Sequence, residues 1–221
     1  MKRIAAALAV CAFLYAQDWP TYNGDFSGKR FSPLTQINSS NIGKLSLSWF
    51  YRINNVGPQR GVGNPTIKST PLVVNGVLYF TIPDHVYALD ARTGEELWHY
   101  GWQDKGGHLV GNRGLGMYGD WLYFMTPDCW FLSLNAKDGK ERWRKKVADE
   151  KMQYFCTMSP LVLKNHVLVG VGGDAMDVPG FSNRATPKPA TCSGGGTPLR
   201  AKANLAPTPG PIRRPWSTAA A

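Results

Sequence analysis

The chain has 221 residues, of which 43% are hydrophobic and eight are tryptophan, so it holds enough apolar surface for one substantial core or two small ones. This composition excludes a chain that is disordered throughout. The formal net charge is +10, but residues 1–181 carry 19 basic and 15 acidic residues, and the other six basic residues lie in the last forty. The charge therefore does not indicate a nucleic-acid partner for the main part of the chain.

The first sixteen residues are typical of a secretory signal peptide. Met1-Lys2-Arg3 precedes an apolar run of twelve residues, 4–15, which is too short for a bilayer span of about twenty residues. We therefore expect residues 1–16 to be cleaved, the protein to be periplasmic or secreted, and no transmembrane segment. A lipid-attachment motif ending at Cys11 is the less favoured alternative, because Val10 stands where a small residue is expected.

An internal repeat is the main indication of the fold. Residues 87–98 recur as residues 132–143, a shift of 45, and each copy follows a matching pair of short strand-like runs. A third copy opens at residues 159–169. Units of about 40–50 residues with four short strands each are typical of a β-propeller, whereas solenoids of that period are helical. We predict an all-β, incomplete β-propeller of four-stranded antiparallel blades, with two blades over residues 70–101 and 115–146.

Turn residues separate the predicted strands. Asn75-Gly76 lies between two β-branched runs, and both residues tolerate the positive φ angles of a type I′ hairpin turn. In the segment from Asp90 to Gly94, the carboxylate can accept downstream backbone N–H groups while the glycine takes the left-handed position. Asn135 and Gly139 can form the same turn in the second copy.

Isolated cysteines and histidines give no metal or haem-attachment motif. Cys129, Cys156 and Cys192 are widely spaced and form no CxxC pair. We interpret Cys129 and Cys156 as small buried hydrophobic residues. The four histidines are scattered, and we interpret them as surface or rim residues rather than ligands: His85, His99, His108 and His166.

The composition changes at Ser182. Residues 182–221 contain seven prolines, four glycines, six basic residues, no acidic residue and one aromatic residue, Trp216. Such a segment cannot bury enough surface to offset its ordering entropy, so we predict an irregular tail. It would follow a partial propeller of about two and a half blades at residues 17–181. A change of reading frame near residue 181 explains the change, and an authentic basic linker is the alternative.

Three segments resemble the PQQ-dependent (quinoprotein) alcohol dehydrogenases. Residues 88–98 read Ala-x-Asp-x-x-Thr-Gly-x-x-x-Trp, which is similar to the motif by which a tryptophan of that family packs between blades of an eight-bladed propeller. Residues 18–25 and 31–38 look like the start of a mature member. The resemblance covers about residues 18–181.

The resemblance implies an oxidoreductase that transfers hydride from an alcohol, or a sugar, to pyrroloquinoline quinone (PQQ) with the help of calcium. An acceptor such as a cytochrome c would take the electrons, and no nucleic acid is involved. The family's catalytic aspartate lies in sequence beyond Phe181, so no catalytic residue is predicted in this chain. We expect the chain to be inactive alone.

The resemblance also supplies candidate site residues. Gly111-Asn112-Arg113-Gly114 is similar to the family's Asn-Arg-Gly, whose arginine binds a PQQ carboxylate, a task suited to an always-charged guanidinium. Thr157 lies fifteen residues before Gly172, which matches the spacing of a PQQ-binding threonine and serine. The cofactor-binding prediction comprises Arg113, Thr157, Gly172, Gly173 and Asp174, and Asp174 is also the candidate calcium ligand.

Several positions depart from the family. Gly172 replaces the serine, and Ala175 replaces the calcium-binding acid, so Asp174 or Asp177 would have to provide the oxygen that calcium needs. Lys68 stands where many members have a glutamate near the quinone, and residues 106–108 replace an adjacent pair of cysteines. These departures keep a second function open, a non-catalytic propeller acting as a scaffold or assembly protein of the cell envelope.

Overall fold

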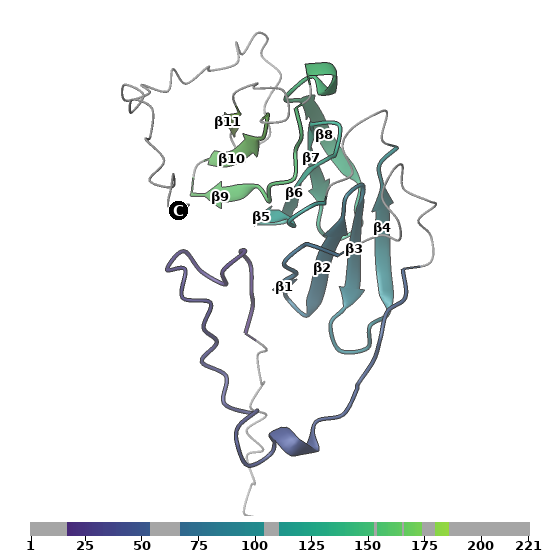
Figure 1. The fold of residues 1–221 in the computed structure, drawn as a ribbon. Coiled ribbons are helices and arrows are strands. Elements are labelled where there is room, and N and C mark those ends of the chain that lie inside the picture. The colour runs from purple at the N-terminus through teal and green to yellow at the C-terminus, as the bar shows by residue number, and fades with distance from the viewer. Residues whose placement is uncertain are drawn as a thin grey trace, which may run out of the picture.

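The chain folds into three antiparallel sheets, seen as three groups of arrows in Figure 1. A computed structural model describes residues 17–53, 67–103, 111–152, 154–164, 166–173 and 180–185. Apart from strands, these residues form two short 3-10 turns, η1 (Ile42–Lys44) and η2 (Glu150–Met152). Within the described ranges, no helix is long and apolar enough to cross a membrane.

Each of the first two sheets has four strands that pair in chain order. The first blade comprises β1 (Leu72–Val74), β2 (Val77–Ile82), β3 (His85–Asp90) and β4 (Glu96–Gly101). The second comprises β5 (Gly116–Tyr118), β6 (Trp121–Met125), β7 (Trp130–Asn135) and β8 (Glu141–Lys146). The two blades predicted from the repeat are thus confirmed.

The third sheet has three strands, β9 (Leu161–Leu163), β10 (His166–Val171) and β11 (Phe181–Ala185). β11 pairs with β10 from Phe181 opposite Val171 to Ala185 opposite Val167. The boundary predicted after residue 181 therefore differs from the structure, because ordered strand extends to Ala185. β10 and β11 pair through backbone hydrogen bonds, and the side-chain composition of the tail does not prevent such bonds. The rest of the predicted tail lies outside the described residues.

The predicted turns form as their residue types require. Asn75 and Gly76 have φ angles of 52° and 76°, as expected for a type I′ turn between β1 and β2. The Asp90 carboxylate accepts the backbone N–H groups of Arg92 and Thr93 at 2.9 and 2.8 Å, and these bonds lower its pKa. Gly94 closes this turn with a φ angle of 75°.

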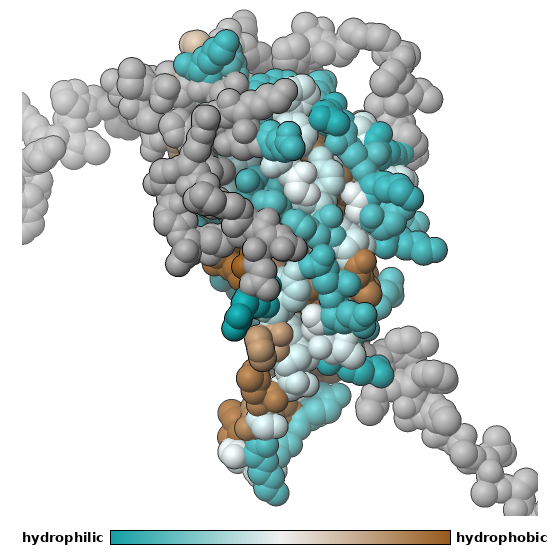
Figure 2. Space-filling view, turned by 90° about the vertical axis from the view of Figure 1, so that its right-hand side faces the viewer, coloured by the Kyte–Doolittle hydropathy of each residue, from teal (hydrophilic) through white to brown (hydrophobic). Residues whose placement is uncertain are grey.

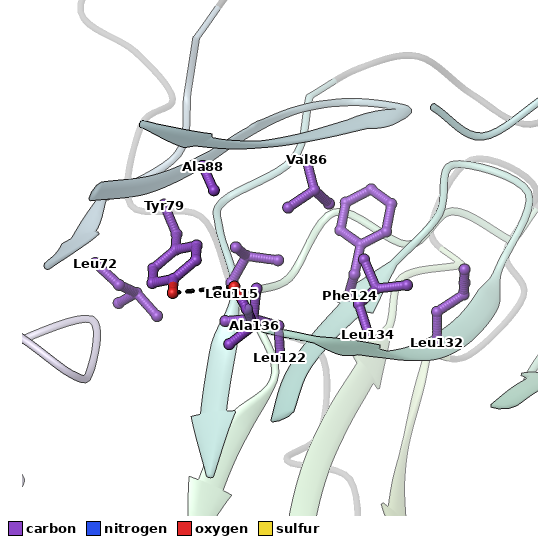
Figure 3. Close-up of a cluster of buried hydrophobic side chains, with 10 residues drawn as sticks. All are labelled: Leu72, Tyr79, Val86, Ala88, Leu115, Leu122, Phe124, Leu132, Leu134 and Ala136. Carbon is purple, nitrogen blue, oxygen red and sulfur yellow. Dashed lines mark hydrogen bonds between the residues drawn. The ribbon is translucent and has the colours of Figure 1, made fainter. Parts of the chain in front are cut away.

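The main core lies between the first and second blades (Figure 3). Leu72, Tyr79 and Val86 of the first blade pack on the same cluster as Leu122 and other residues of the second. The Tyr79 hydroxyl donates a hydrogen bond of 3.2 Å to the backbone carbonyl of Ala136, drawn as the dashed line in Figure 3. Burying apolar side chains from both sheets at about 25 cal/mol per Å² joins the blades into one unit.

Tryptophan side chains connect each unit to the blade that follows it. Trp98 of β4 lies over Gly139 of the second blade, and its Nε1 donates to the Ala136 carbonyl at 2.9 Å. Trp49, in the segment before the first blade, lies over Gly94 in the same way, with its Nε1 3.3 Å from the Ala91 carbonyl. This role of Trp49 was not predicted from the sequence. Trp49 lies 49 residues before Trp98, which is close to the repeat length.

Trp143 is the corresponding residue of the second blade. It packs on the core that the second blade shares with the third. Its Nε1 is buried and has no hydrogen-bond partner in the described part of the chain.

Cys129 and Cys156 form a disulfide bond. Both are fully buried, as predicted, but the interpretation of them as unpaired hydrophobic residues is wrong. Cys129 lies in the turn between β6 and β7, and Cys156 lies before β9, with Cα atoms 5.2 Å apart. The bond therefore ties the second blade to the third. An exported protein is the usual context for such a bond.

Two of the supposedly scattered histidines also come together. His85 Nδ1 of β3 lies 2.7 Å from His99 Nε2 of β4, so the prediction that the histidines are scattered is wrong for this half-buried pair. His166 lies in β10 of the third sheet, and His108 lies outside the described residues.

The segment before the first blade is the most exposed part of the described chain. Figure 2 shows hydrophilic residues over the blades and hydrophobic ones gathered at the narrow lower end. The exposed large apolar residues of this segment are Tyr22, Phe26, Phe31, Leu34, Ile37, Ile42, Leu45, Leu47 and Phe50. Trp19, by its bridge to Val73, and Trp49 hold the segment to the first blade.

Candidate functional site

An apolar cavity of about 270 Å³ lies where the first strands of the second and third blades meet the N-terminal segment. β5 and β9 contact each other there and lie side by side in Figure 1. Among the described residues that line the cavity, Arg113 is the only charged one. The lining consists of Pro20, Thr21, Tyr22, Asn23, Arg113, Leu115, Gly116, Met117, Met158, Ser159, Pro160, Leu161 and Val162.

Neighbouring segments on both sides fix the backbone of Arg113. Its N–H donates to the Thr157 carbonyl at 2.9 Å, and its carbonyl accepts from the Thr70 N–H at 3.3 Å. The Arg113 side chain is exposed, and its guanidinium forms no ion pair with the described residues. A full positive charge is therefore held at the edge of an apolar cavity and is free to bind an anion.

The buried side chain of Asn112 anchors this segment through hydrogen bonds. This role was not predicted from the sequence. The side chain is buried, and its Oδ1 accepts hydrogen bonds from Thr81 Oγ1 at 2.5 Å and from the Gly114 N–H at 2.8 Å. Its Nδ2 donates to the Met125 carbonyl at 2.9 Å. An amide side chain next to the arginine of a predicted binding motif was the available indication, because such a side chain must find internal partners when buried.

Thr157 lies beside Arg113, as the backbone hydrogen bond between them shows. Its side chain is half-buried. No hydrogen bond joins its hydroxyl to the residues that the structure describes, and it follows the disulfide-bonded Cys156 directly. The structure thus brings together two of the predicted cofactor-binding residues, one a cation and one a hydroxyl donor.

Gly172 is placed differently. Its N–H and its carbonyl both bond to the backbone of Phe155, at 2.9 and 3.0 Å. A Cβ atom at Gly172 would collide with the Phe155 ring, so that ring fills the space in which a serine side chain would begin. Gly172 therefore offers neither a side chain nor an unused backbone group. Gly173 is buried next to it.

The predicted calcium ligand, Asp174, lies outside the described residues, as do Ala175, Asp177 and residues 106–108. In the described ranges, no three His, Cys, Asp or Glu residues gather in a way that could hold a metal ion. Calcium binding stays a prediction.

Lys68, the other departure from the family, lies next to the Asn-Arg-Gly segment. A Cβ atom at Gly111 would lie 2.7 Å from its Cδ, so the lysine stem crosses the space above this glycine. Gly111 is two residues from Arg113. The stem of a lysine therefore passes beside the Asn-Arg-Gly segment at this point.

Comparison with known proteins gives one family and many relatives. The model of the glucose/ethanol/alcohol dehydrogenase β-propeller domain, the PQQ family, matches residues 19–120. The 1-butanol dehydrogenase (cytochrome c) of Thauera butanivorans is 33% identical over 85% of this chain and 27% of its own length. The quinohemoprotein alcohol dehydrogenase ADH IIB of Pseudomonas putida is 34% identical over 74% of this chain and 24% of its own length.

Solved structures agree with these relatives. The quinohemoprotein alcohol dehydrogenase of Comamonas testosteroni is 32% identical and superposes with a TM-score of 0.66, over 77% of this chain and 25% of that one. A europium-containing methanol dehydrogenase is 31% identical with a TM-score of 0.65, over 77% and 30%. The chain spans about a quarter of the length of the curated relatives it matches. By its repeat, its blades and these matches, the chain belongs to the PQQ-dependent (quinoprotein) alcohol dehydrogenase family.

Proposed function

We propose that this chain forms one wall of a PQQ site in an alcohol-oxidising dehydrogenase, with Arg113 binding a carboxylate of the cofactor. The observation that carries the proposal is the guanidinium of Arg113, which has no ion-pair partner among the described residues and lies at the edge of an apolar cavity. The hydroxyl of Thr157, beside Arg113, provides a neutral donor for the same edge of the cofactor.

The residues present fit such a ligand. PQQ is a flat aromatic quinone that carries three carboxylates, so it needs an apolar slot and cations at its edge. The cavity provides the apolar surface, and Arg113 provides a planar donor group that can bind a carboxylate through two parallel hydrogen bonds. Because Gly172 replaces a serine, we expect one hydroxyl contact fewer than in relatives that have this serine.

The cofactor, when bound, would supply the redox chemistry by accepting a hydride, which carries two electrons, from the alcohol carbon. The residues of this chain bind it and fix its orientation, and the cavity wall excludes water from one of its faces. Among the described residues that line the cavity there is no Asp, Glu or His, so none of these side chains is suited to take the proton of the alcohol hydroxyl. We infer that another part of the enzyme provides this base.

Substrate, acceptor and location follow as parts of the same proposal. We place alcohols before sugars because the relatives described above are named alcohol dehydrogenases. A cytochrome c is the proposed acceptor, as the name of the Thauera relative suggests. The apolar leader and the disulfide bond both support export to an oxidising compartment. Calcium, with Asp174 as its ligand, is kept as the proposed metal.

Arg113→Ala is expected to weaken PQQ binding by about ten- to a hundred-fold, because a hydrogen-bonded charge pair contributes about 1.5–3 kcal/mol. Quenching of tryptophan fluorescence in the full chain measures the affinity, which we expect near 0.1–1 mM, since one wall provides few contacts. Arg113→Lys should bind PQQ with intermediate affinity, because lysine keeps the charge but cannot form the two parallel hydrogen bonds. Arg92→Ala, an exposed arginine of the first blade, is the matched control. Equal effects of the Arg113 and Arg92 variants would contradict the proposal.

The chain alone should show no dye-linked alcohol oxidation above a protein-free control when PQQ and calcium are supplied. The physical reason is that the described residues that line the cavity include no side chain suited to act as the base. Turnover that Arg113→Ala abolishes would show that this chain does more than form a wall of the site.

A further inference from the structure

A pair of histidines lies outside the cavity, on one face of the first blade. His85 begins β3 opposite Gly101, and His99 near the end of β4 lies opposite Tyr87. The two imidazoles are therefore diagonal neighbours across the strands. Their ring centres are 4.8 Å apart, and Nδ1 of His85 lies 2.7 Å from Nε2 of His99. Gly101 has no side chain to cover the Nδ1 edge of His85, which lies 3.2 Å from where its Cβ would be.

We propose that this pair binds a divalent transition metal, zinc, copper or nickel, through His85 Nδ1 and His99 Nε2. Zinc–nitrogen bonds are about 2.0–2.1 Å long. Two imidazoles on one ion, at an angle of about 90–110°, then have ring centres about 4.5–5.2 Å apart and nitrogens about 2.9–3.4 Å apart. The observed ring centres, at 4.8 Å, lie within this range, whereas the two nitrogens, at 2.7 Å, are at hydrogen-bond distance and have to move apart. A small rotation of the two rings that increases the Nδ1–Nε2 distance by a few tenths of an ångström makes room for the ion.

Neighbouring side chains orient both rings. Asp84 Oδ1 lies 3.4 Å from Nε2 of His85, on the side of the ring away from His99. A carboxylate in this position keeps the proton on Nε2 and leaves the Nδ1 lone pair for a metal, as is usual for metal-binding histidines. Tyr87 stacks on His99 with ring centres 4.3 Å apart and planes within 2° of parallel, which fixes the second ring.

The surroundings suit a cation that binds neutral imidazole. Both rings are half-buried, and a metal ion binds the neutral form of imidazole. Asp84 and Glu96 add negative charge near the pair, and the hydroxyl of Tyr51 bonds to Glu96 and positions it.

The bound ion would clamp the start of β3 to the end of β4. Two histidines leave room for water or a third ligand to complete the coordination shell. Because an ion bound only by the folded chain stabilises that state by mass action, the site would stabilise the first blade. This role does not depend on the cofactor proposed above, so a negative result here leaves the PQQ proposal unaffected.

Calorimetric titration of the untagged full chain with zinc chloride tests the site. The background carries Cys11→Ala and Cys192→Ala, which removes thiols that would compete for the ion. We expect one ion per chain with a dissociation constant in the micromolar range, weakened at least about tenfold by His85→Gln or His99→Gln. Asp84→Asn should weaken binding less, because it removes an orienting partner. His166→Gln, in the third sheet, is the matched control and should bind zinc like the background chain.

Copper(II) electron paramagnetic resonance of the same folded background chain gives a second measurement. Two equivalent imidazole nitrogens should appear in the hyperfine pattern, and one in each single glutamine variant that circular dichroism shows to be folded. Zinc affinity that is unchanged in the His85→Gln/His99→Gln double variant would overturn the proposal. So would a background copper spectrum without two-nitrogen coupling, whether or not the glutamine variants fold.

Discussion

Replacing Cys129 and Cys156 together by alanine is expected to lower the free energy of unfolding by about 3–4 kcal/mol. The disulfide closes a loop with a sequence separation of 27, and a cross-link of that length removes about 3.5 kcal/mol of chain entropy from the unfolded state. Both sulfurs are buried within the core that the second and third blades share. Urea unfolding at pH 7, with and without a dithiol reductant, measures the effect.

Cys192→Ala is the matched control because it removes a cysteine and leaves the pair intact. We expect its unfolding curve to match the wild type. The reductant should destabilise the wild type and the control, and it should leave the double variant unchanged. A loss below about 1 kcal/mol in the double variant would contradict a stabilising bond between Cys129 and Cys156.

The substitution Gly139→Ala is expected to lower the free energy of unfolding by about 2–4 kcal/mol. Gly139 has a φ angle of 69°, which costs an alanine about 1–2 kcal/mol. Its Cβ would also lie 2.6 Å from the ring of Trp98. Moving this ring would break the 2.9 Å bond from its Nε1 to the Ala136 carbonyl and open the packing between the first two blades, which adds about 1–2 kcal/mol. Urea unfolding gives the difference.

Gly76→Ala separates the two causes. Gly76 has a φ angle of 76° and no atom within 4 Å of its Cβ position, so only the backbone cost of about 1–2 kcal/mol applies there. A larger loss at Gly139 than at Gly76 is the expected result. Equal losses would show that the position of Trp98 over the glycine contributes nothing to stability.

The architecture of the two blades could be predicted because its determinants are local. Asn75-Gly76 and the Asp90 to Gly94 segment specify their turns through backbone conformation and side-chain acceptors that lie within a few residues. The 45-residue repeat then sets how the blades follow one another. The role of Trp49 was not predicted, because the residues before it do not contain the turn motif that precedes Trp98. Only its contact with Gly94 reveals its role.

Other features depend on where distant segments meet. The pairing of Cys129 with Cys156 requires the second and third blades to be placed against each other, which spacing alone does not determine. The diagonal approach of His85 and His99 depends on the register of β3 and β4, which shifts at an irregularity between Ala88 and Leu89. A one-residue slip would turn one ring to the other face.

The candidate site was predicted in part. The sequence identified Arg113 and Thr157, and the structure brings their backbones together. The replacement of a serine by Gly172 could be read from the sequence, but its physical reason, the Phe155 ring in that space, could not. The roles of these residues toward PQQ, and of Asp174 toward calcium, stay predictions.

A nitrogen–proton correlation titration of the full chain with PQQ tests whether Arg113 and the cavity bind the cofactor, because it locates binding residue by residue. We expect the largest shifts on the amides of Arg113, Thr157 and the cavity residues from Leu115 to Met117, and we expect Arg113→Ala to remove them. Shifts confined to residues outside this cavity, or a pattern that Arg113→Ala leaves unchanged, would contradict this expectation.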